Sequence, residues 1–344
     1  MMTHKERFLA TIERKEVDYP ASWLGDPSKE ANKRLMEYFK VDSPAKVKAI
    51  LGDDIFQVEV PYNHPPANHI ACAFDFAVEN EDYEERSLTC EGFFANSTSV
   101  DDVDKFDWPD PHEHMDPAEC EKVVSEAPDD MPVMGMMWSA HFQDACAAFG
   151  METALMKMML EPELFQAVID RIVEFYLEAN KIFYEATKGK LDAVLIGNDF
   201  GSQQALMLSP DLLRQFVFEG TKKFTDQAKS YGLKVIHHSC GSVFDIIPDL
   251  IEIGVDAIHP IQAKAAGMEA TRLHEHFAGK TSFCGGVDTQ DLLVHGSPED
   301  VMANVRHLKE LFPTGLILSP SHEALQPDVP PQNIEAMFKA IKEK

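Results

Sequence analysis

The stretch of residues 191–319 contains five short apolar runs, LDAVLIG (191–197), LKVIHH (233–238), VDAIH (255–259), TSFCG (281–285) and GLILS (315–319). Segments with helical patterns separate the runs. One of them begins at Ser209-Pro210, where serine suits the N-cap and proline suits the first turn. Short apolar strands that alternate with helices predict βα units and a parallel sheet. We therefore expect five βα units in the second half of the chain.

Three earlier runs, at 19–24, 55–60 and 132–137, extend the pattern. Three and five units make eight, the number found in a (β/α)8 TIM barrel, which is an α/β fold. The length of 344 residues suits a single elaborated barrel domain over 1–344. The region from about 64 to 130 fits worst, and its runs 70–78 and 86–97 predict a β-hairpin insertion. A doubly wound open sheet is the alternative, but no glycine-rich phosphate-binding turn follows a strand.

The chain is strongly acidic, with 31 Lys and Arg against 58 Asp and Glu and a net charge of −27. Phosphate backbones and anionic membrane surfaces repel such a chain, so we expect neither a nucleic-acid nor a membrane partner. No apolar run follows the opening MMTHKER, so we expect no signal peptide. The six cysteines are too scattered for a disulfide framework. These features together predict a cytoplasmic protein with reduced thiols.

Polar side chains cluster just after the apolar runs, where a barrel enzyme carries its chemistry. Asp199 follows one run, and its carboxylate suits a general acid or base, a partner for a metal-binding histidine, or a group that orients substrate. A helix N-cap is its structural alternative. We expect His322 to serve beside Asp199 in catalysis. The other strand-end residues predicted to contact substrate are Trp138, His141, Gln203, His259, Gln262, Asp288 and Glu323.

The sharpest motif is His238-x-Cys240. In an extended chain, residues two apart share a face, so the imidazole and the thiolate point the same way while His237 points to the opposite face. A thiolate with an imidazole suits zinc, and a third protein ligand would leave one position open. Cys284 and His322 are the candidates for that ligand. Packing alone also produces such pairs, and Cys284 has the alternative of being a small buried hydrophobe.

Several segments carry a resemblance to a known family: KERFLA (5–10), VDYP (17–20), GNDFGSQ (197–203), HSCG (238–241) and PPQNI (330–334). With these the chain resembles the uroporphyrinogen decarboxylase superfamily along most of its length. The resemblance implies a (β/α)8 barrel and two different chemistries. One branch decarboxylates a tetrapyrrole without a cofactor and grips the substrate carboxylates with arginines near the N-terminus. The other branch contains zinc-dependent methyltransferases that act with corrinoid proteins.

The methyltransferase branch carries His-x-Cys after the fifth strand and a further ligand, normally cysteine, after the eighth. His238 and Cys240 match the motif residue by residue. At the third position the chain departs from it, because His322 is nearest to the place of the cysteine, and Cys284 could substitute from a neighbouring strand. The paired arginines of the decarboxylase branch are missing from WLGDPSKEANKR (23–34). A substrate with many carboxylates would be poorly bound without them.

The leading hypothesis is a zinc-dependent methyltransferase that moves a methyl group between a small molecule, as donor or acceptor, and a corrinoid protein. Either a substrate thiol accepts the methyl group or a methoxy group donates it. The sequence lacks the Asp-x-His-x-x-Gly motif of a cobalamin-binding domain, so the corrinoid would be supplied by a separate partner. Two alternatives remain. One is a metal-free lyase that decarboxylates a small carboxylate with Asp199 and His322. The other is a non-catalytic binding subunit.

Overall fold

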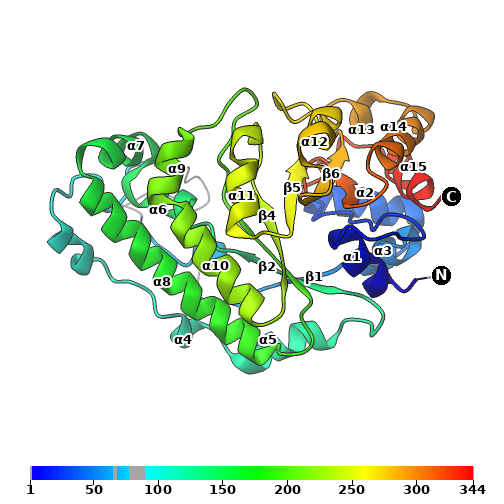
Figure 1. The fold of residues 1–344 in the computed structure, drawn as a ribbon. Helices are drawn as coiled ribbons and strands as arrows, with labels where there is room; N and C mark the ends of the chain where they lie inside the picture. Colours follow the sequence, from blue (N-terminus) through cyan, green and yellow to red (C-terminus); the bar gives the residue numbers. More distant parts are fainter. Residues whose placement is uncertain (1, 65–67, 77–89, 344) are drawn as a thin grey trace.

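A computed structural model describes residues 2–64, 68–76 and 90–343 (Figure 1). Seven parallel strands form one sheet in the order β1-β2-β3-β4-β5-β6-β7, so each strand pairs with its neighbour in the sequence. The strands are β1 (Phe56–Glu59), β2 (Val133–Trp138), β3 (Ala193–Gly197), β4 (Lys234–His238), β5 (Ala257–Ile261), β6 (Ser282–Val287) and β7 (Leu316–Pro320). Helices connect them, as the alternation predicts for parallel strands.

The helices before β3 are α1 (His4–Ile12), α2 (Lys29–Phe39), α3 (Pro44–Leu51), α4 (Pro111–His114), α5 (Pro117–Ser125), α6 (His141–Phe149), α7 (Met151–Leu160) and α8 (Pro162–Ala186). Those after β3 are α9 (Pro210–Phe216), α10 (Phe218–Ser230), α11 (Ile247–Ile253), α12 (Ala270–Phe277), α13 (Leu292–His295), α14 (Pro298–Leu311) and α15 (Pro331–Lys342). Short 3-10 turns occur at η1 (Ile70–Cys72), η3 (Val100–Lys105) and η4 (Phe244–Ile246). In Figure 1, helices α6 to α10 lie on one side of the strands, and both termini lie on the other side with α1, α3 and α15.

The sheet curls around an inner hydrophobic cluster. Side chains alternate between the two faces of a strand, so one face of each strand supplies this cluster and the other packs against the helices. Its buried members are Phe8, Ile12, Ala21, Trp23, Ile55, Met134, Met136, Ala193, Leu195, Ile236, Ala257, Cys284 and Ile317. The fold is therefore α/β with a curled parallel sheet, compatible with a barrel-like architecture.

The first predicted strand differs from the expectation. In place of a strand over 19–24, the structure has one isolated parallel bridge between Ser22 and Leu318. The N–H of Trp23 donates to the Leu318 carbonyl at 3.0 Å, and the N–H of Asp54 donates to the Ser22 carbonyl at 3.1 Å. The segment thus lies between β7 and the residues before β1, but its ladder is too short to count as a strand. Seven of the eight predicted runs form named strands.

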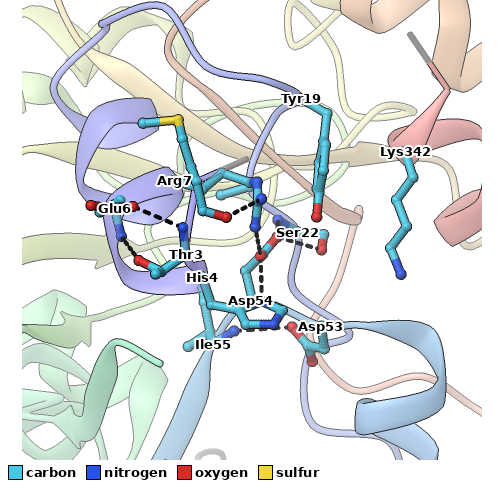
Figure 2. Close-up of polar contacts among 12 residues, drawn as sticks. Thr3, His4, Glu6, Arg7, Tyr19, Ser22, Asp53, Asp54, Ile55 and Lys342 are labelled. Atoms are coloured by element: carbon cyan, nitrogen blue, oxygen red, sulfur yellow. Dashed lines mark hydrogen bonds and ion pairs between the residues drawn. The ribbon is translucent and has the colours of Figure 1, made fainter. Parts of the chain in front are cut away.

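A buried ion-pair network holds this segment in place (Figure 2). Arg7 of α1 is 1% exposed, and its Nη1 donates to Asp54 Oδ1 at 2.7 Å. Its Nε donates to Asp18 Oδ1 at 2.9 Å. Asp54 Oδ2 accepts from both the backbone N–H and the hydroxyl of Ser22, each at 2.9 Å. Buried side-chain contacts therefore add to the few backbone hydrogen bonds that hold this segment beside β7.

The predicted hairpin insertion is not confirmed. The described residues 70–76 begin with the turn η1, and neither they nor residues 90–97 form a named strand. Residues 77–89, where the predicted hairpin turns, lie outside the described residues. Among the residues that are described, no helix combines the length and the apolar character needed to span a bilayer.

Candidate metal and active site

The carboxyl ends of the strands bring together most of the titratable side chains predicted for the site. His238 ends β4, Cys240 follows two residues later, and His259 lies in β5. Asp199 comes two residues after the end of β3, and His322 and Glu323 come two and three residues after the end of β7. Parallel strands all end at the same edge of the sheet, so residues far apart in the sequence meet there.

His238 and Cys240 lie on the same side, as their spacing predicts. The distance between His238 Nε2 and Cys240 Sγ is 3.6 Å. Asp199 joins them, because its Oδ1 lies 3.2 Å from His238 Nε2 and accepts the backbone N–H of Cys240 at 2.9 Å. The Asp199 side chain is 36% exposed against 6% for His238, so it forms the solvent side of this group.

The other ring nitrogen of His238 faces a second set of groups. His238 Nδ1 lies 3.0 Å from His259 Nδ1 and 3.7 Å from Glu323 Oε2. Glu323 Oε2 in turn lies 3.6 Å from His322 Nδ1. Both of its neighbours are titratable, yet this buried oxygen has no hydrogen-bond partner in the described part of the chain. Glu323 therefore has spare acceptor capacity inside the site.

Three overlapping groups of potential metal ligands follow from these distances. Within each group, the ligand atoms lie no more than 4.8 Å from one another. The groups, drawn from the described residues, are Asp199, His238 and Cys240; His238, His259 and Glu323; and Cys240, His322 and Glu323. A tetrahedral zinc with a Zn–S bond of ~2.3 Å and a Zn–N bond of ~2.0 Å separates its two ligand atoms by about 3.5 Å. The 3.6 Å between His238 Nε2 and Cys240 Sγ matches that separation.

The charges in the site are strongly coupled. Burial raises the pKa of Asp199, but the hydrogen bond and charge of His238 outweigh it and lower this pKa to about 2. Burial opposes charge on His238, yet Asp199, Cys240 and Glu323 raise its pKa well above the usual value. Burial lowers the pKa of His259. The hydrogen bond to Cys240 raises the pKa of His322. Asp199 is therefore an anion at neutral pH, and it stabilises the protonated form of His238 beside it.

Cys284, the other candidate for a third metal ligand, lies apart from these groups. It is fully buried in the inner hydrophobic cluster, and burial raises the pKa of its thiol. None of the three groups of described residues contains it. His322 is better placed than Cys284 to be the third metal ligand, because it shares a group of potential ligands with Cys240 and Glu323.

Two residues predicted to contact substrate adjoin the metal-ligand candidates. The Trp138 ring lies 5.5 Å from the His238 ring in an edge-on arrangement. Trp138 has a φ of 54°, a value rare for bulky side chains, at the end of β2. Gln262 Oε1 accepts the N–H of Gly241 at 2.5 Å and so fixes the turn after Cys240.

Three other residues predicted to contact substrate have structural partners. His141 is buried, and its Nδ1 and Nε2 lie 3.1 and 3.0 Å from the backbone oxygens of Ser139 and Val217. Asp288 accepts the N–H groups of Gln290, Asp291 and Leu292 and so holds the turn that leads into α13. The Gln203 carbonyl accepts the N–H of Ala266 at 2.9 Å, and its side chain is exposed. These contacts show no part for the three residues in the groups around His238.

Sequence reasoning missed two carboxylates at this edge. Burial, and to a smaller extent the negative charges of Glu59 and Glu323, raise the pKa of Asp26, while Lys48 and the hydrogen bond to Gln57 oppose them. The N–H of Asp26 also donates to the Glu323 carbonyl at 2.8 Å. A signal was available for Asp26, because it comes two residues after the first predicted strand, as Asp199 does after β3. Glu59 is the last residue of β1 and was open to the same argument.

Comparison with known proteins gives the family and the fold. The family model of uroporphyrinogen decarboxylase (URO-D) matches residues 91–344. A solved structure, a methyltransferase from Methanosarcina mazei, superposes with a TM-score of 0.65 at 17% identity, covering 99% of this chain and 98% of that one. A protein from Listeria monocytogenes, provisionally described as a vitamin-B12-independent methionine synthase, gives a TM-score of 0.45 at 11% identity over 95% of each chain. No curated protein matches the chain. The match over residues 91–344 includes the whole His238–Cys240 region and confirms the resemblance noted in the sequence: the chain belongs to the uroporphyrinogen decarboxylase (URO-D) family.

Proposed function

We propose that this protein is a zinc-dependent methyltransferase that moves a methyl group between a small molecule and a corrinoid protein. The observation that carries the proposal is the 3.6 Å separation of His238 Nε2 and Cys240 Sγ, which suits two ligands of one zinc ion. The similarity in fold to a methyltransferase from Methanosarcina mazei supports this chemistry within the family.

His238 and Cys240 would hold the metal, with His322 or Cys284 as the third ligand. When bound, zinc would act as a Lewis acid that lowers the pKa of a substrate thiol or polarises a methoxy oxygen. Asp199 is ionised, partly exposed and 3.2 Å from His238 Nε2, so its carboxylate is placed to accept a hydrogen bond from the substrate group and to orient it. Trp138 would form a wall of the substrate site beside His238.

The charges at the mouth argue against a substrate with many carboxylates. Burial and the charges of Glu59 and Glu323 raise the pKa of Asp26 against the opposing charge of Lys48, and Glu59 and Glu323 would repel a polyanion. The corrinoid would come from a separate protein, because this sequence has no Asp-x-His-x-x-Gly motif. We also propose that residues 1–344 form one barrel domain in which the segment around Ser22 takes the place of the eighth strand.

The test combines metal content with methyl transfer. Zinc would be measured by mass spectrometry on wild type, His238→Ala and Cys240→Ala, all purified without a histidine tag. Methyl transfer from methylcobalamin to a panel of small thiols would be followed by the change in cobalamin absorbance. We expect about one zinc per chain in the wild type, and loss of both zinc and transfer in the two variants. Cys120→Ala is the matched control, because Cys120 is buried on α5.

A folded wild type without zinc would overturn the proposal. The metal-free lyase would then be the better hypothesis, and it predicts that Cys240→Ala is tolerated. Zinc without methyl transfer in either direction, combined with stable complex formation with a corrinoid protein, would instead favour a binding subunit.

A further inference from the structure

We propose that a cavity on the outer side of β1 is a binding site for a small, uncharged and largely apolar molecule, such as one built on an aromatic ring. The cavity has a volume of about 580 Å³ and is lined by residues of α3, the start of β1 and the segment 128–131. Ligand pockets in proteins usually measure about 300–1,000 Å³. This inference does not depend on the proposed methyltransferase function.

The sequences of β1 and α3 explain why there is space at this place. Ile55 belongs to the inner hydrophobic cluster, so Phe56, the next residue, faces outward, and its side chain lines the cavity. Ala45 and Ala49 line it from α3, and these two residues are neighbours on one face of the helix. Their short side chains leave room beside Phe56 that larger residues would fill.

The walls of the cavity are largely apolar. Besides Phe56, the apolar side chains of Pro27, Pro44, Pro128 and Met131 line it, and apolar atoms make up most of the lining surface. Such walls bind aromatic or aliphatic surface through the hydrophobic effect and dispersion. They therefore favour a ligand whose body is apolar.

The charged groups deepest in the lining already have partners within the protein. Lys48 Nζ donates to Gln57 Oε1 at 2.8 Å and to the Gly25 carbonyl at 3.2 Å. It also lies 3.9 Å from Asp53 Oδ2, and the Asp53 carboxylate accepts two backbone N–H groups. A charge on the ligand would lose its hydration against the apolar walls without gaining a free partner there. The ligand is therefore uncharged.

An anionic ligand meets a further penalty. The lining contains three aspartates, Asp26, Asp53 and Asp130, against one lysine and one histidine. The histidine is His4, and its Nδ1 is already paired with Asp54 at 2.7 Å. The whole chain has a net charge of −27. A carboxylate or sulfonate on the ligand would therefore be repelled.

The cavity is a site of its own beside the candidate metal site. None of the described residues in the three groups of potential metal ligands lines it. Asp26 does line it, and the N–H of Asp26 donates to the Glu323 carbonyl at 2.8 Å. The cavity and the candidate metal site are thus neighbours that share one segment of chain as a wall.

The test compares two fluorescent probes that differ in one charged group. N-phenyl-1-naphthylamine is uncharged, and 8-anilinonaphthalene-1-sulfonate carries a sulfonate on the same ring system. Each would be titrated into the full-length protein and followed by the rise in its emission. We expect saturable binding of the uncharged probe, with an affinity at least about tenfold higher than that of the sulfonate. Equal affinities, or no saturable binding of the uncharged probe, would overturn the proposal.

Ala49→Glu tests whether the uncharged probe binds in this cavity. Ala49 is exposed on α3, so we expect the variant to fold, with its carboxylate at the wall of the cavity. We expect its affinity for N-phenyl-1-naphthylamine to fall at least about tenfold. Ala303→Glu, at an exposed position on α14, is the matched control and should bind the probe as the wild type does. The same affinity in the two variants would place the probe elsewhere and contradict the proposal.

A second measurement uses the wild-type protein. With the methionine methyl groups labelled with 13C, the spectrum of Met131→Leu identifies the signal of Met131. Because Met131 lines the cavity, an aromatic probe bound there should shift this signal. Shifts confined to other methionines would overturn the proposal. So would a wild type that is dimeric by light scattering and an Ala49→Glu variant that is monomeric, because a second copy of the chain would then cover the cavity.

Discussion

Cys240 Sγ lies 3.6 Å from Nε2 of His238. His237, the residue before His238, points to the other face of β4, where its ring stacks against Phe200. The backbone N–H of Cys240 is held by Asp199 at 2.9 Å, so the residue after β3 fixes the turn that carries the thiol. The pair is therefore placed by a local rule, the alternation of side chains in a strand, and secured by a contact between strands.

The third ligand can be assigned by comparing His322 with Cys284. We expect His322→Ala to lose zinc on dialysis, because His322 shares a ligand group with Cys240 and Glu323. Cys284→Ala should keep its zinc, because Cys284 lies in the inner hydrophobic cluster. We expect Cys284→Ala to lower the free energy of unfolding by about 1 kcal/mol. Metal analysis after dialysis, with urea unfolding in parallel, checks both; the reverse pattern would make Cys284 the ligand.

Gly241 should be intolerant of a side chain. It has a φ of +86°, and a Cβ built on it would lie 2.3 Å from the Gly201 backbone carbon. Gly241→Ala must therefore displace the turn that carries Cys240, and we expect weaker zinc binding along with about 1–3 kcal/mol of strain. Gly232→Ala is the control, since its φ is +79° but nothing lies within 4 Å of the added Cβ. Equal zinc affinity in the two variants would contradict this account of the turn.

Arg7 should contribute more to stability than an exposed ion pair does. Arg7→Leu would leave the buried Asp54 with His4 as its remaining ion-pair partner and would remove the partner of Asp18, at a cost of up to about 3–5 kcal/mol. Lys5→Ala is the comparison. Lys5 Nζ lies 2.7 Å from Asp192 Oδ1, but the Lys5 side chain is 38% exposed. We expect its removal to lower the free energy of unfolding by about 0–1 kcal/mol. Urea unfolding followed by circular dichroism gives both values. Similar midpoints for the two variants would show that the network does not secure the N-terminal segment.

Asp144 should make stability depend on pH. Burial raises its pKa to about 7, against the opposing hydrogen bond from Tyr176. The native state then holds a proton that the unfolded state has already lost, so stability falls as pH rises from about 4 to 7. The slope is at most about 1.4 kcal/mol per pH unit. Asp144→Asn removes this dependence.

The measurement for Asp144 is the difference in unfolding free energy between variant and wild type at pH 5 and at pH 7.5. We expect the free energy of unfolding of Asp144→Asn, relative to that of the wild type, to be larger at the higher pH than at the lower one. Asp129→Asn, at an exposed position, controls for the loss of a carboxylate. A difference that does not change with pH would mean that Asp144 is not proton-linked to folding.

The sequence predicted most of the strands because buried parallel strands are short, nearly continuous apolar runs between amphipathic helices. It failed for residues 19–24, where a single bridge at Ser22 and the buried charges of Arg7 and Asp54 replace a ladder. Charge networks between distant segments leave no periodic pattern in the sequence. The hairpin expected from the runs 70–78 and 86–97 is not confirmed: the described residues 70–72 form a 3-10 turn, and residues 77–89 lie outside the described part of the chain.

For the candidate site, the sequence by itself determined that His238 and Cys240 lie on the same side, because residues two apart in an extended chain share a face whatever the rest of the fold does. That rule was enough for His238 and Cys240. Only the tertiary structure decided that His259 meets His238, that Asp199 holds the turn at Cys240, and that His322 rather than Cys284 shares a ligand group with Cys240. These relationships depend on register and on the curl of the sheet, which are set by packing across strands far apart in the chain.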